Sequence, residues 1–409
     1  MLEKLRIQGF KSIQDETFAF GQVNVFIGGN GSGKSNIFEA MGLLSAALGY
    51  EITTHELLRR GVRAPFPKRF LSAFKHPGPV DRLTLDATCS DGVGYRCVLE
   101  VPDSAPGLRF LEETISFQDE ELLVRANGSF AFDEQNRNAS NYPSRGAWQL
   151  FREARAWPKE VSTQLDLLSR FVIFAPQIDM LRGSFSETAD VPPFGLKGGG
   201  ISKESLDFIR RPEISPIFTR VLGASVWVDS SKDIAEQVRV IQLEKRCILL
   251  FIDKFIDTDG GIISSLECND GILFQTFMAA TLLHQDAPRC FAMENIDSIL
   301  NPAMTRRMME EVIAVVRQQS ETPIGPEQIF LSTHHPTALD AVDLFDDEQR
   351  VFVVERNEQG ATVATRLQPA PGWTPEDWWQ FARNGRLSEL WIEGRIRSAL
   401  GPETDKNAP

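Results

Sequence analysis

The stretch GQVNVFIGGNGSGKSNIFEA, residues 21–40, decides the fold. It predicts a hydrophobic strand, a glycine-rich turn and an apolar helix, and it contains the complete pattern GxxxxGKS. Such a turn lets successive backbone N–H groups, together with the positive end of the helix, point at phosphate groups. Lys34 is expected to bridge the outer phosphates of ATP, and Ser35 to offer its hydroxyl to Mg²⁺. The residues predicted to bind the nucleotide here are Gly28, Asn30, Gly31, Ser32, Gly33, Lys34, Ser35 and Asn36.

Length and composition limit the remaining possibilities. The 409 residues are enough for one large domain with an insertion or for two ordinary domains. A net charge of −13 excludes a uniformly basic surface, so any nucleic acid must be bound by a local patch. The five cysteines form no CxxC pattern, and no apolar run reaches about 18 residues. We therefore expect a cytoplasmic protein that makes no contact with a membrane.

Two stretches carry a family resemblance. LRIQGFKSI (5–13) and VNVFIGGNGSGKSNIFEA (23–40) resemble the ATP-binding heads of RecF, SMC and OLD-type ATPases, an ABC-like branch of the AAA-family proteins. The resemblance implies an α/β fold: a P-loop NTPase of the ABC type with a flanking antiparallel sheet and a helical insertion. It also implies an order along the chain, namely Walker A, a glutamine loop, a signature loop, Walker B, a D-loop and a switch histidine.

Two segments match the glutamine and signature loops. In FVIFAPQIDMLRG (171–183) an apolar strand leads to Gln177, whose amide is expected to sense the metal; an ordinary surface glutamine is the alternative. In LECNDGILFQTFMAATLL (266–283), Asn269, Asp270 and Gly271 precede an apolar helix, although Asn and Asp are also good helix caps. In relatives the signature acts on the nucleotide of the other subunit. The resemblance therefore implies a homodimer that forms on ATP binding.

The segment CFAMENIDSILNP (290–302) resembles a Walker B strand and D-loop. This alignment places Glu294 at the metal-side acid, Asn295 at the general base and Asp297 in the D-loop. An amide cannot take a proton from water, so we expect weakened hydrolysis. In a register shifted by one residue, Glu294 is the base instead.

IFLSTHHPTALD (329–340) resembles the strand that ends in the switch histidine, which places His334 near the γ-phosphate; a structural histidine is the alternative. The predicted catalytic residues are therefore Gln177, Glu294, Asn295 and His334, and the predicted Mg²⁺ ligands are Ser35, Gln177 and Glu294.

The sequence as a whole predicts four regions. Alternating stretches from about 80 to 132 favour an antiparallel sheet, and EQVRVIQLEKRCILLFIDKF (236–255) favours a helix. Four of the seven tryptophans lie in the segment 372–396, which predicts a helix that either packs on the core or binds a partner. The predicted regions are an ATPase lobe (1–132), a helical insertion with the glutamine loop (133–265), a lobe with the signature, Walker B, D-loop and switch histidine (266–368), and a helical tail (369–409).

One stretch is basic. RRGVRAPFPKRFLSAFK (59–75) has six basic residues and no acidic ones. Three roles are open for these basic residues: they are solvated, they bind nucleic acid, or they dock a partner. Phe66, Phe70 and Phe74 are spaced for one buried helix face. The candidates for contact with nucleic acid are Arg59, Arg60, Arg63, Lys68 and Arg69.

No effector motif is found in the sequence, neither a metal-binding HExxH nor a nucleophile elbow. The resemblance then implies an ATPase that dimerises on ATP and regulates a separate nuclease or toxin, in bacterial antiphage defence. The alternative is a DNA-binding repair ATPase of the RecF kind. A transporter subunit is disfavoured because LRIQGFKSI and ECNDG differ from transporter signatures.

Overall fold

The structure is a computed structural model. It describes residues 1–63, 66–102, 107–132, 135–154, 156–183, 191, 193–204, 211, 214–222, 225, 227–229, 231–232, 234–243, 246–318, 325–382 and 385–396. Among these residues, no helix combines the length and the apolar character that are needed to cross a membrane.

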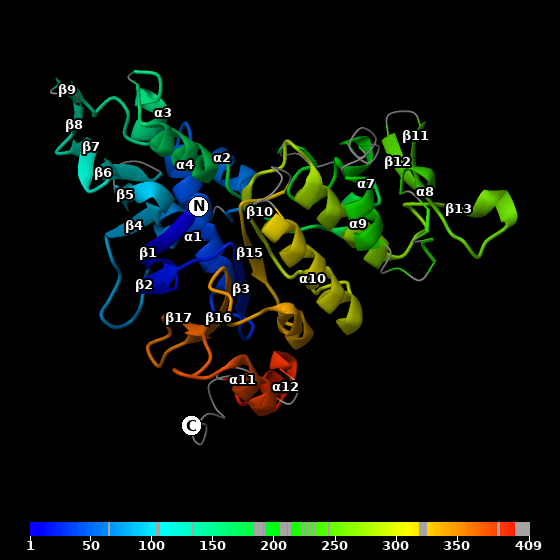
Figure 1. Ribbon diagram of the computed structural model, residues 1–409. Coiled ribbons are helices and arrows are strands. Elements are labelled where there is room, and N and C mark those ends of the chain that lie inside the picture. Colours follow the sequence, from blue (N-terminus) through cyan, green and yellow to red (C-terminus); the bar gives the residue numbers. More distant parts are fainter. Residues whose placement is uncertain are drawn as a thin grey trace.

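A six-stranded sheet forms the centre of the molecule (Figure 1). Its strands, in spatial order, are β10 (Val172–Phe174), β14 (Cys290–Met293), β15 (Gln328–Ser332), β3 (Val23–Ile27), β16 (Gln349–Arg356) and β17 (Thr362–Leu367). All neighbouring pairs are parallel except β16 and β17. The residues of β3, β14 and β15 are buried throughout, as short apolar strands covered on both faces require. The α/β fold expected from the sequence is confirmed.

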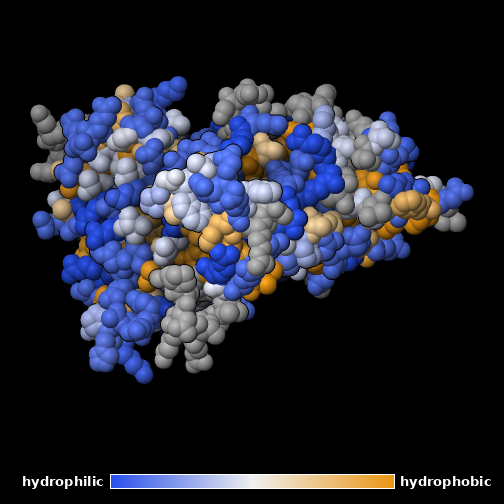
Figure 2. All heavy atoms as spheres, turned by 60° about the horizontal axis from the view of Figure 1, so that its bottom comes forward, coloured by the Kyte–Doolittle hydropathy of each residue, from blue (hydrophilic) through white to orange (hydrophobic). Residues whose placement is uncertain are grey.

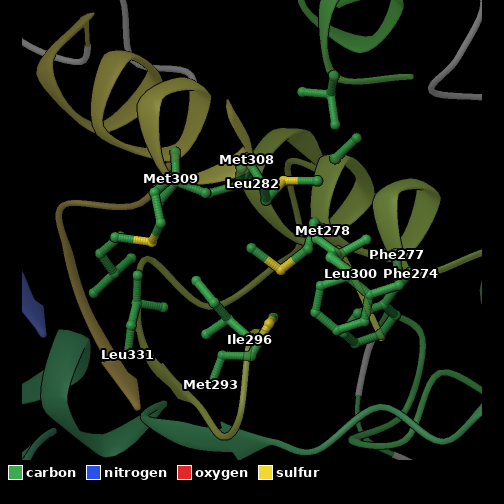
Figure 3. Close-up of a cluster of buried hydrophobic side chains, with 14 of the residues drawn as sticks. Phe274, Phe277, Met278, Leu282, Met293, Ile296, Leu300, Met308, Met309 and Leu331 are labelled. Atoms are coloured by element: carbon green, nitrogen blue, oxygen red, sulfur yellow. The ribbon is translucent and has the colours of Figure 1, made fainter. Parts of the chain in front are cut away.

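Two hydrophobic cores cover the two faces of this sheet. Val23, Val25 and Ile27 of β3 pack into one core with α9 (Asp270–Leu283) and α10 (Pro302–Gln318). Figure 3 shows this core, in which methionines of α9, α10 and β14 fill the space between the helices and the sheet. Phe26 points to the other core, with α1 (Lys34–Leu48) and α4 (Lys159–Ser169).

An eight-stranded antiparallel sheet flanks the centre and contributes to the second core. The sheet expected from about 80 to 132 is present, and it also takes in strands from the first 19 residues and a strand at 135–138. Side chains alternate between buried and exposed along β4, as in a sheet with one covered face. Its strands, in spatial order, are β2 (Ile13–Ala19), β1 (Leu2–Phe10), β4 (Arg82–Cys89), β5 (Val93–Glu100), β6 (Arg109–Phe117), β7 (Glu120–Ala126), β8 (Ser129–Phe132) and β9 (Gln135–Asn138).

The insertion is only partly helical, and the prediction of a helix at 236–255 is wrong. This segment forms β11 (Val238–Leu243) and β12 (Arg246–Ile252), which pair antiparallel and continue to β13 (Ile262–Ser264). The β-branched and apolar residues of VRVIQL and RCILLFI favour strands, and the pairing buries Leu249 and Phe251 in the first core. Further short helices are α2 (Thr54–Arg59), α3 (Ala147–Phe151), α5 (Ile178–Leu181), α7 (Ser215–Leu222) and α8 (Ile234–Gln237).

Exposed apolar side chains gather at the outer end of this three-stranded sheet. Phe255 is 70% exposed, and Ile256 and Ile262 are exposed nearby. Orange and tan spheres mark this region at the right-hand end of Figure 2. The end of the insertion therefore presents an apolar surface.

The tryptophan-rich tail forms two helices, α11 (Pro375–Phe381) and α12 (Leu387–Ile392). The hydroxyl and the backbone N–H of Ser388 both donate to Asp340 in the 3₁₀ helix η4 (Pro336–Ala341), at 2.6 and 2.9 Å. Trp378 and Trp391 pack against the first core. The tail thus packs on the core, next to the segment that follows His334.

Candidate nucleotide-binding site

The glycine-rich turn lies between β3 and α1, as predicted. Gly28 and Gly33 adopt φ values of 148° and 114°, which side chains rarely tolerate. A Cβ atom on Gly33 would lie 2.0 Å from the Thr362 hydroxyl oxygen, and one on Gly28 would lie 2.1 Å from the Val354 carbonyl oxygen. Both glycines are therefore required by the backbone conformation and by the close approach of β16 and β17.

A chain of hydrogen bonds holds this loop. The Asn36 amide donates to the Ser12 hydroxyl at 2.6 Å, and the Ser12 and Thr362 hydroxyl oxygens lie 2.7 Å apart. Thr362 in turn donates to the Ser32 carbonyl at 2.9 Å. Three segments that are distant in sequence thus hold the loop through hydrogen bonds, which reduces the ordering cost of binding.

Lys34 is the buried cation of the site. The residue is 6% exposed, and its ammonium donates to the Gly28 and Gly29 carbonyls at 2.7 and 3.1 Å. Burial lowers the pKa of Lys34 to about 8, although the charges of Asp297 and Glu294 partly oppose this shift. The nearby Ser32 hydroxyl is buried without a hydrogen-bond partner among the described residues. A desolvated cation and an unpaired hydroxyl in a glycine cradle fit the phosphates of a nucleotide.

ATP binding is expected to weaken as pH rises through 8. Phosphate oxygens favour the charged form of Lys34, whose pKa in the free protein is about 8. At pH 8, binding should then take up roughly half a proton, and at pH 9 affinity should be roughly tenfold lower than at pH 7. Titration calorimetry in two buffers that differ in ionisation enthalpy measures this uptake. Lys34→Arg keeps its charge and should show no uptake; equal uptake in both proteins would contradict the assignment.

The Walker B segment ends β14 beside the loop. Glu294 follows the strand, is half-buried, and its N–H donates to the Phe174 carbonyl of β10 at 2.9 Å. Asn295 is exposed and has a left-handed φ of 52°, with its N–H donating to the Ser332 hydroxyl at 3.0 Å. Asn tolerates this conformation better than Glu does. The backbone thus directs Glu294 and Asn295 differently, and the Glu294 charge acts on Lys34.

His334 lies at the end of β15, as predicted. Its backbone N–H donates to both carboxylate oxygens of Asp297 at 3.2 Å. Burial lowers the pKa of His334, as does the neighbouring Lys34, while Asp297 and the Gly28 backbone oppose this change. The structure therefore brings Lys34, Glu294, Asp297 and His334 together at the carboxyl ends of parallel strands, where ligands bind in open α/β sheets.

Gln177 lies at the same edge of the sheet. It follows β10, is exposed, and its N–H donates to the Lys197 carbonyl at 3.1 Å. Within the described ranges no three His, Cys, Asp or Glu side chains form a metal-binding group. Mg²⁺ commonly uses one or two protein ligands together with phosphates and water, so the predicted ligands Ser35, Gln177 and Glu294 remain chemically suitable.

The signature residues lie elsewhere, at the beginning of α9. Asn269 caps the helix by accepting from the Ile272 N–H at 3.0 Å, while the Asp270 carboxylate forms an ion pair with Arg182. Asn269 and Asp270 are both exposed. The contacts described for them are with Ile272 and Arg182, not with the glycine-rich turn.

Three arginines of the basic stretch 59–75 form ion pairs with glutamates in the structure. Arg59 and Arg60 pair with Glu56 at 3.2 and 2.6 Å, and Arg63 pairs with Glu39 of α1. Lys68 and Arg69 are exposed in the short 3₁₀ helix η1 (Pro67–Phe70). The single buried helix face predicted for three phenylalanines is wrong: Phe70 is buried, but Phe66 is 83% exposed, because the 3₁₀ helix spans one turn only.

Sequence reasoning missed the residues that brace the site from β16 and β17. Besides Thr362, the Arg356 guanidinium donates to the Gly31 carbonyl at 2.9 Å and to the Gly360 carbonyl at 2.6 Å. Neither residue belongs to a motif. The only signal was the β-strand character of VFVVER and TVATRL, which does not indicate a contact with the loop.

Fold and site together define a P-loop ATPase head of the ABC-like AAA class. The chain belongs to the family described as "AAA domain, putative AbiEii toxin, Type IV TA system", whose model matches residues 23–340. No curated protein sequence matches the chain.

Similar solved structures include SMC heads. An SMC head bound to the C-terminal winged-helix domain of ScpA has 14% identity and a TM-score of 0.49, with coverage of 90% of this chain and 98% of that one. The SMC head domain from Thermotoga maritima has 14% identity and a TM-score of 0.44, with 90% and 99% coverage. An SMC head with an extended coiled coil, bound to the C-terminal domain of ScpA from Pyrococcus furiosus, has 14% identity and a TM-score of 0.44, with 90% and 96% coverage.

Proposed function

We propose that the protein binds ATP with Mg²⁺, hydrolyses it slowly, dimerises in the ATP-bound state and regulates a separate effector in bacterial antiphage defence. The proposal of slow hydrolysis is supported by the pair Glu294 and Asn295. Glu294 is a carboxylate whose charge acts on Lys34, and the residue that follows it is an exposed amide. ATP then acts mainly as a long-lived clamp, because no carboxylate stands at the position of the general base.

Each side chain has a defined task in this proposal. Lys34 binds the outer phosphates and supplies charge where it builds up during phosphoryl transfer. Ser35, Gln177 and Glu294 would hold Mg²⁺, whose chemistry is to neutralise phosphate charge. Asp297 holds the backbone of His334, so that the imidazole stays next to Gly28. Positioning and electrostatics alone support slow turnover.

The exposed signature residues support a dimer in which Asn269, Asp270 and Gly271 of one copy cover the nucleotide of the other. ATP with Mg²⁺ is then expected to double the mass measured by light scattering, whereas ADP should not. Gly271→Arg should abolish dimerisation, because Gly271 is partly exposed beside the cap and an arginine there would obstruct the contact surface.

The matched control for this variant is Gly372→Arg, since Gly372 lies in an exposed turn in which an added Cβ meets nothing within 4 Å. Because its φ of 83° strains any side chain, thermal melting must show that both variants fold. The same oligomer in the apo, ADP and ATP forms of the wild type would refute the dimer.

One observation supports a separate effector: within the described part of the chain there is no acidic or histidine cluster that could hold a catalytic metal. The family description names a toxin of a type IV toxin–antitoxin system, which supports a role in defence but does not place the effector on another chain. The apolar end of the insertion, with Phe255 exposed, is the kind of surface that binds proteins. Co-purification from the host identifies the partner.

A repair factor that binds DNA is the second candidate, supported by the exposed Lys68 and Arg69. Binding to plain duplex that falls steeply with salt would favour it. If Lys68→Ala with Arg69→Ala leaves any duplex binding unchanged, this stretch is not the contact.

A further inference from the structure

A cavity of about 720 Å³ lies at the amino ends of β10, β14 and β15, whereas the glycine-rich turn follows the carboxyl end of β3. These strands are parallel, so the cavity and the turn lie at opposite edges of the sheet. Residues of α2, of the end of α4 and of the loop 285–289 form its walls. Small-molecule sites commonly enclose roughly 300–1,000 Å³. The cavity is therefore large enough for a small molecule and separate from the nucleotide site.

The wall formed by α2 and the end of α4 is cationic. Three guanidinium groups lie on it, those of Arg59, Arg60 and Arg170. The Glu56 carboxylate serves two of them, at 3.2 Å from Arg59 and 2.6 Å from Arg60. The Asp166 carboxylate on the same wall is taken by Arg152, at 2.6 Å. Positive charge therefore exceeds negative charge on this wall.

Arg170 carries the charge that is left without a counter-ion. Its side chain is exposed to the cavity and forms no ion pair with any residue that the structure describes. Its backbone is fixed against α2, because the Arg60 guanidinium donates to the Ser169 carbonyl at 3.3 Å and the Arg60 carbonyl accepts from the Ile173 N–H at 3.0 Å. An oxyanion at this wall would gain charge-assisted hydrogen bonds without displacing an existing ion pair.

The rest of the lining gives a ligand an apolar contact and an orientation. The apolar residues of the lining include Leu167, Val172, Ala287 and Pro288. The wall opposite α2 carries Asp286 and the ion pair of Arg289 with Glu327, at 3.3 Å. A bound molecule would therefore turn its anionic end to Arg170, away from Asp286, and its apolar body to the apolar strip.

We propose that this cavity is a second small-molecule site, which binds an organic oxyanion: a phosphate or a carboxylate group on an apolar body. Arg170 is its main contact with the anionic group. The inference goes beyond the proposed function and does not depend on it, since none of its residues belongs to the glycine-rich turn or to the segments that end in Glu294 and His334.

Titrations followed by saturation-transfer NMR test the proposal, with phenyl phosphate and benzoate as probes and phenol as the neutral probe of similar shape. At least one of the two anions should bind the wild type in the millimolar range, and phenol at least about tenfold more weakly. The two anions distinguish a phosphate site from a carboxylate site. Arg170→Gln should weaken binding about tenfold, the low end for a hydrogen bond to a charged group, because Arg170 is exposed.

Two further variants place the probe in the cavity. Lys34→Ala should bind the anion like the wild type, because the glycine-rich turn lies at the other edge of the sheet. Arg220→Gln is the matched control, since Arg220 is also exposed and pairs with Glu311 at 3.0 Å on another surface; it should likewise leave binding unchanged. Thermal melting checks that Arg170→Gln folds. Failure of both anions to bind, equal binding of phenol, full binding by Arg170→Gln, or loss of binding in Lys34→Ala would each overturn the proposal.

Discussion

Replacing Lys34 by alanine is expected to weaken ATP binding about 30- to 4,000-fold, which corresponds to the roughly 2–5 kcal/mol that truncating one partner of a buried charge pair costs. The effect is large because Lys34 is 6% exposed and its ammonium is already desolvated. Phosphate binding therefore pays little further desolvation penalty for the lysine, and the variant loses a strong charge-assisted contact. Titration calorimetry with ATP and Mg²⁺ measures the loss.

The control for this variant is Lys203→Ala, because the Lys203 side chain is 77% exposed beside Glu204. It should bind ATP like the wild type. If Lys34→Ala binds ATP as tightly as this control, the nucleotide does not bind at the glycine-rich turn.

Replacing Asn295 by glutamate is expected to accelerate single-turnover ATP cleavage about 10²- to 10⁴-fold, the contribution of a positioned general base. The ATP-bound dimer should become correspondingly shorter-lived. Because Asn295 has a φ of 52°, the glutamate also carries a strain of about 1–2 kcal/mol, which should appear as a lower melting temperature.

Asn295→Gln separates the two effects, since glutamine has the length and the strain of glutamate but cannot act as a base. It should melt like Asn295→Glu and cleave like the wild type. Glu294→Gln should impair Mg²⁺-dependent binding as well as turnover, because Glu294 is proposed on the metal side. Robust wild-type turnover that Glu294→Gln abolishes without weaker binding, and that Asn295→Glu fails to raise, would instead make Glu294 the base.

The sequence predicts the parts of the site that are built from residues close together in the chain. The residues that shape the glycine turn lie between Gly28 and Ser35, and the turn forms between β3 and α1 as expected. The strands that end before Gln177, Glu294 and His334 are short apolar runs followed by polar residues, so their ends could be placed by inspection.

What could not be predicted depends on distant partners. Thr362 and Arg356 lie outside every motif, and their contacts with the loop exist only because β16 lies beside β3 and β17 beside β16. Ser12 belongs to the stretch LRIQGFKSI, but its hydrogen bonds with Asn36 and Thr362 join segments that are distant in the sequence. The segment 236–255 is compatible with helical spacing. It forms strands because its two halves pair antiparallel, for example Val240 with Leu249. Local preference yields to tertiary pairing in such segments.

The hydrogen bond from Thr362 to the Ser32 carbonyl has a consequence for protein synthesis, because it joins residues 330 positions apart. Ribosomes add about 5–20 residues per second, so the stretch that contains Lys34 waits on the order of tens of seconds for the strand that completes its cradle. A nascent chain can thus carry the whole GxxxxGKS sequence and still lack a formed loop. Nucleotide would then stabilise only nearly finished chains, and it could not serve as a template for the early steps of folding.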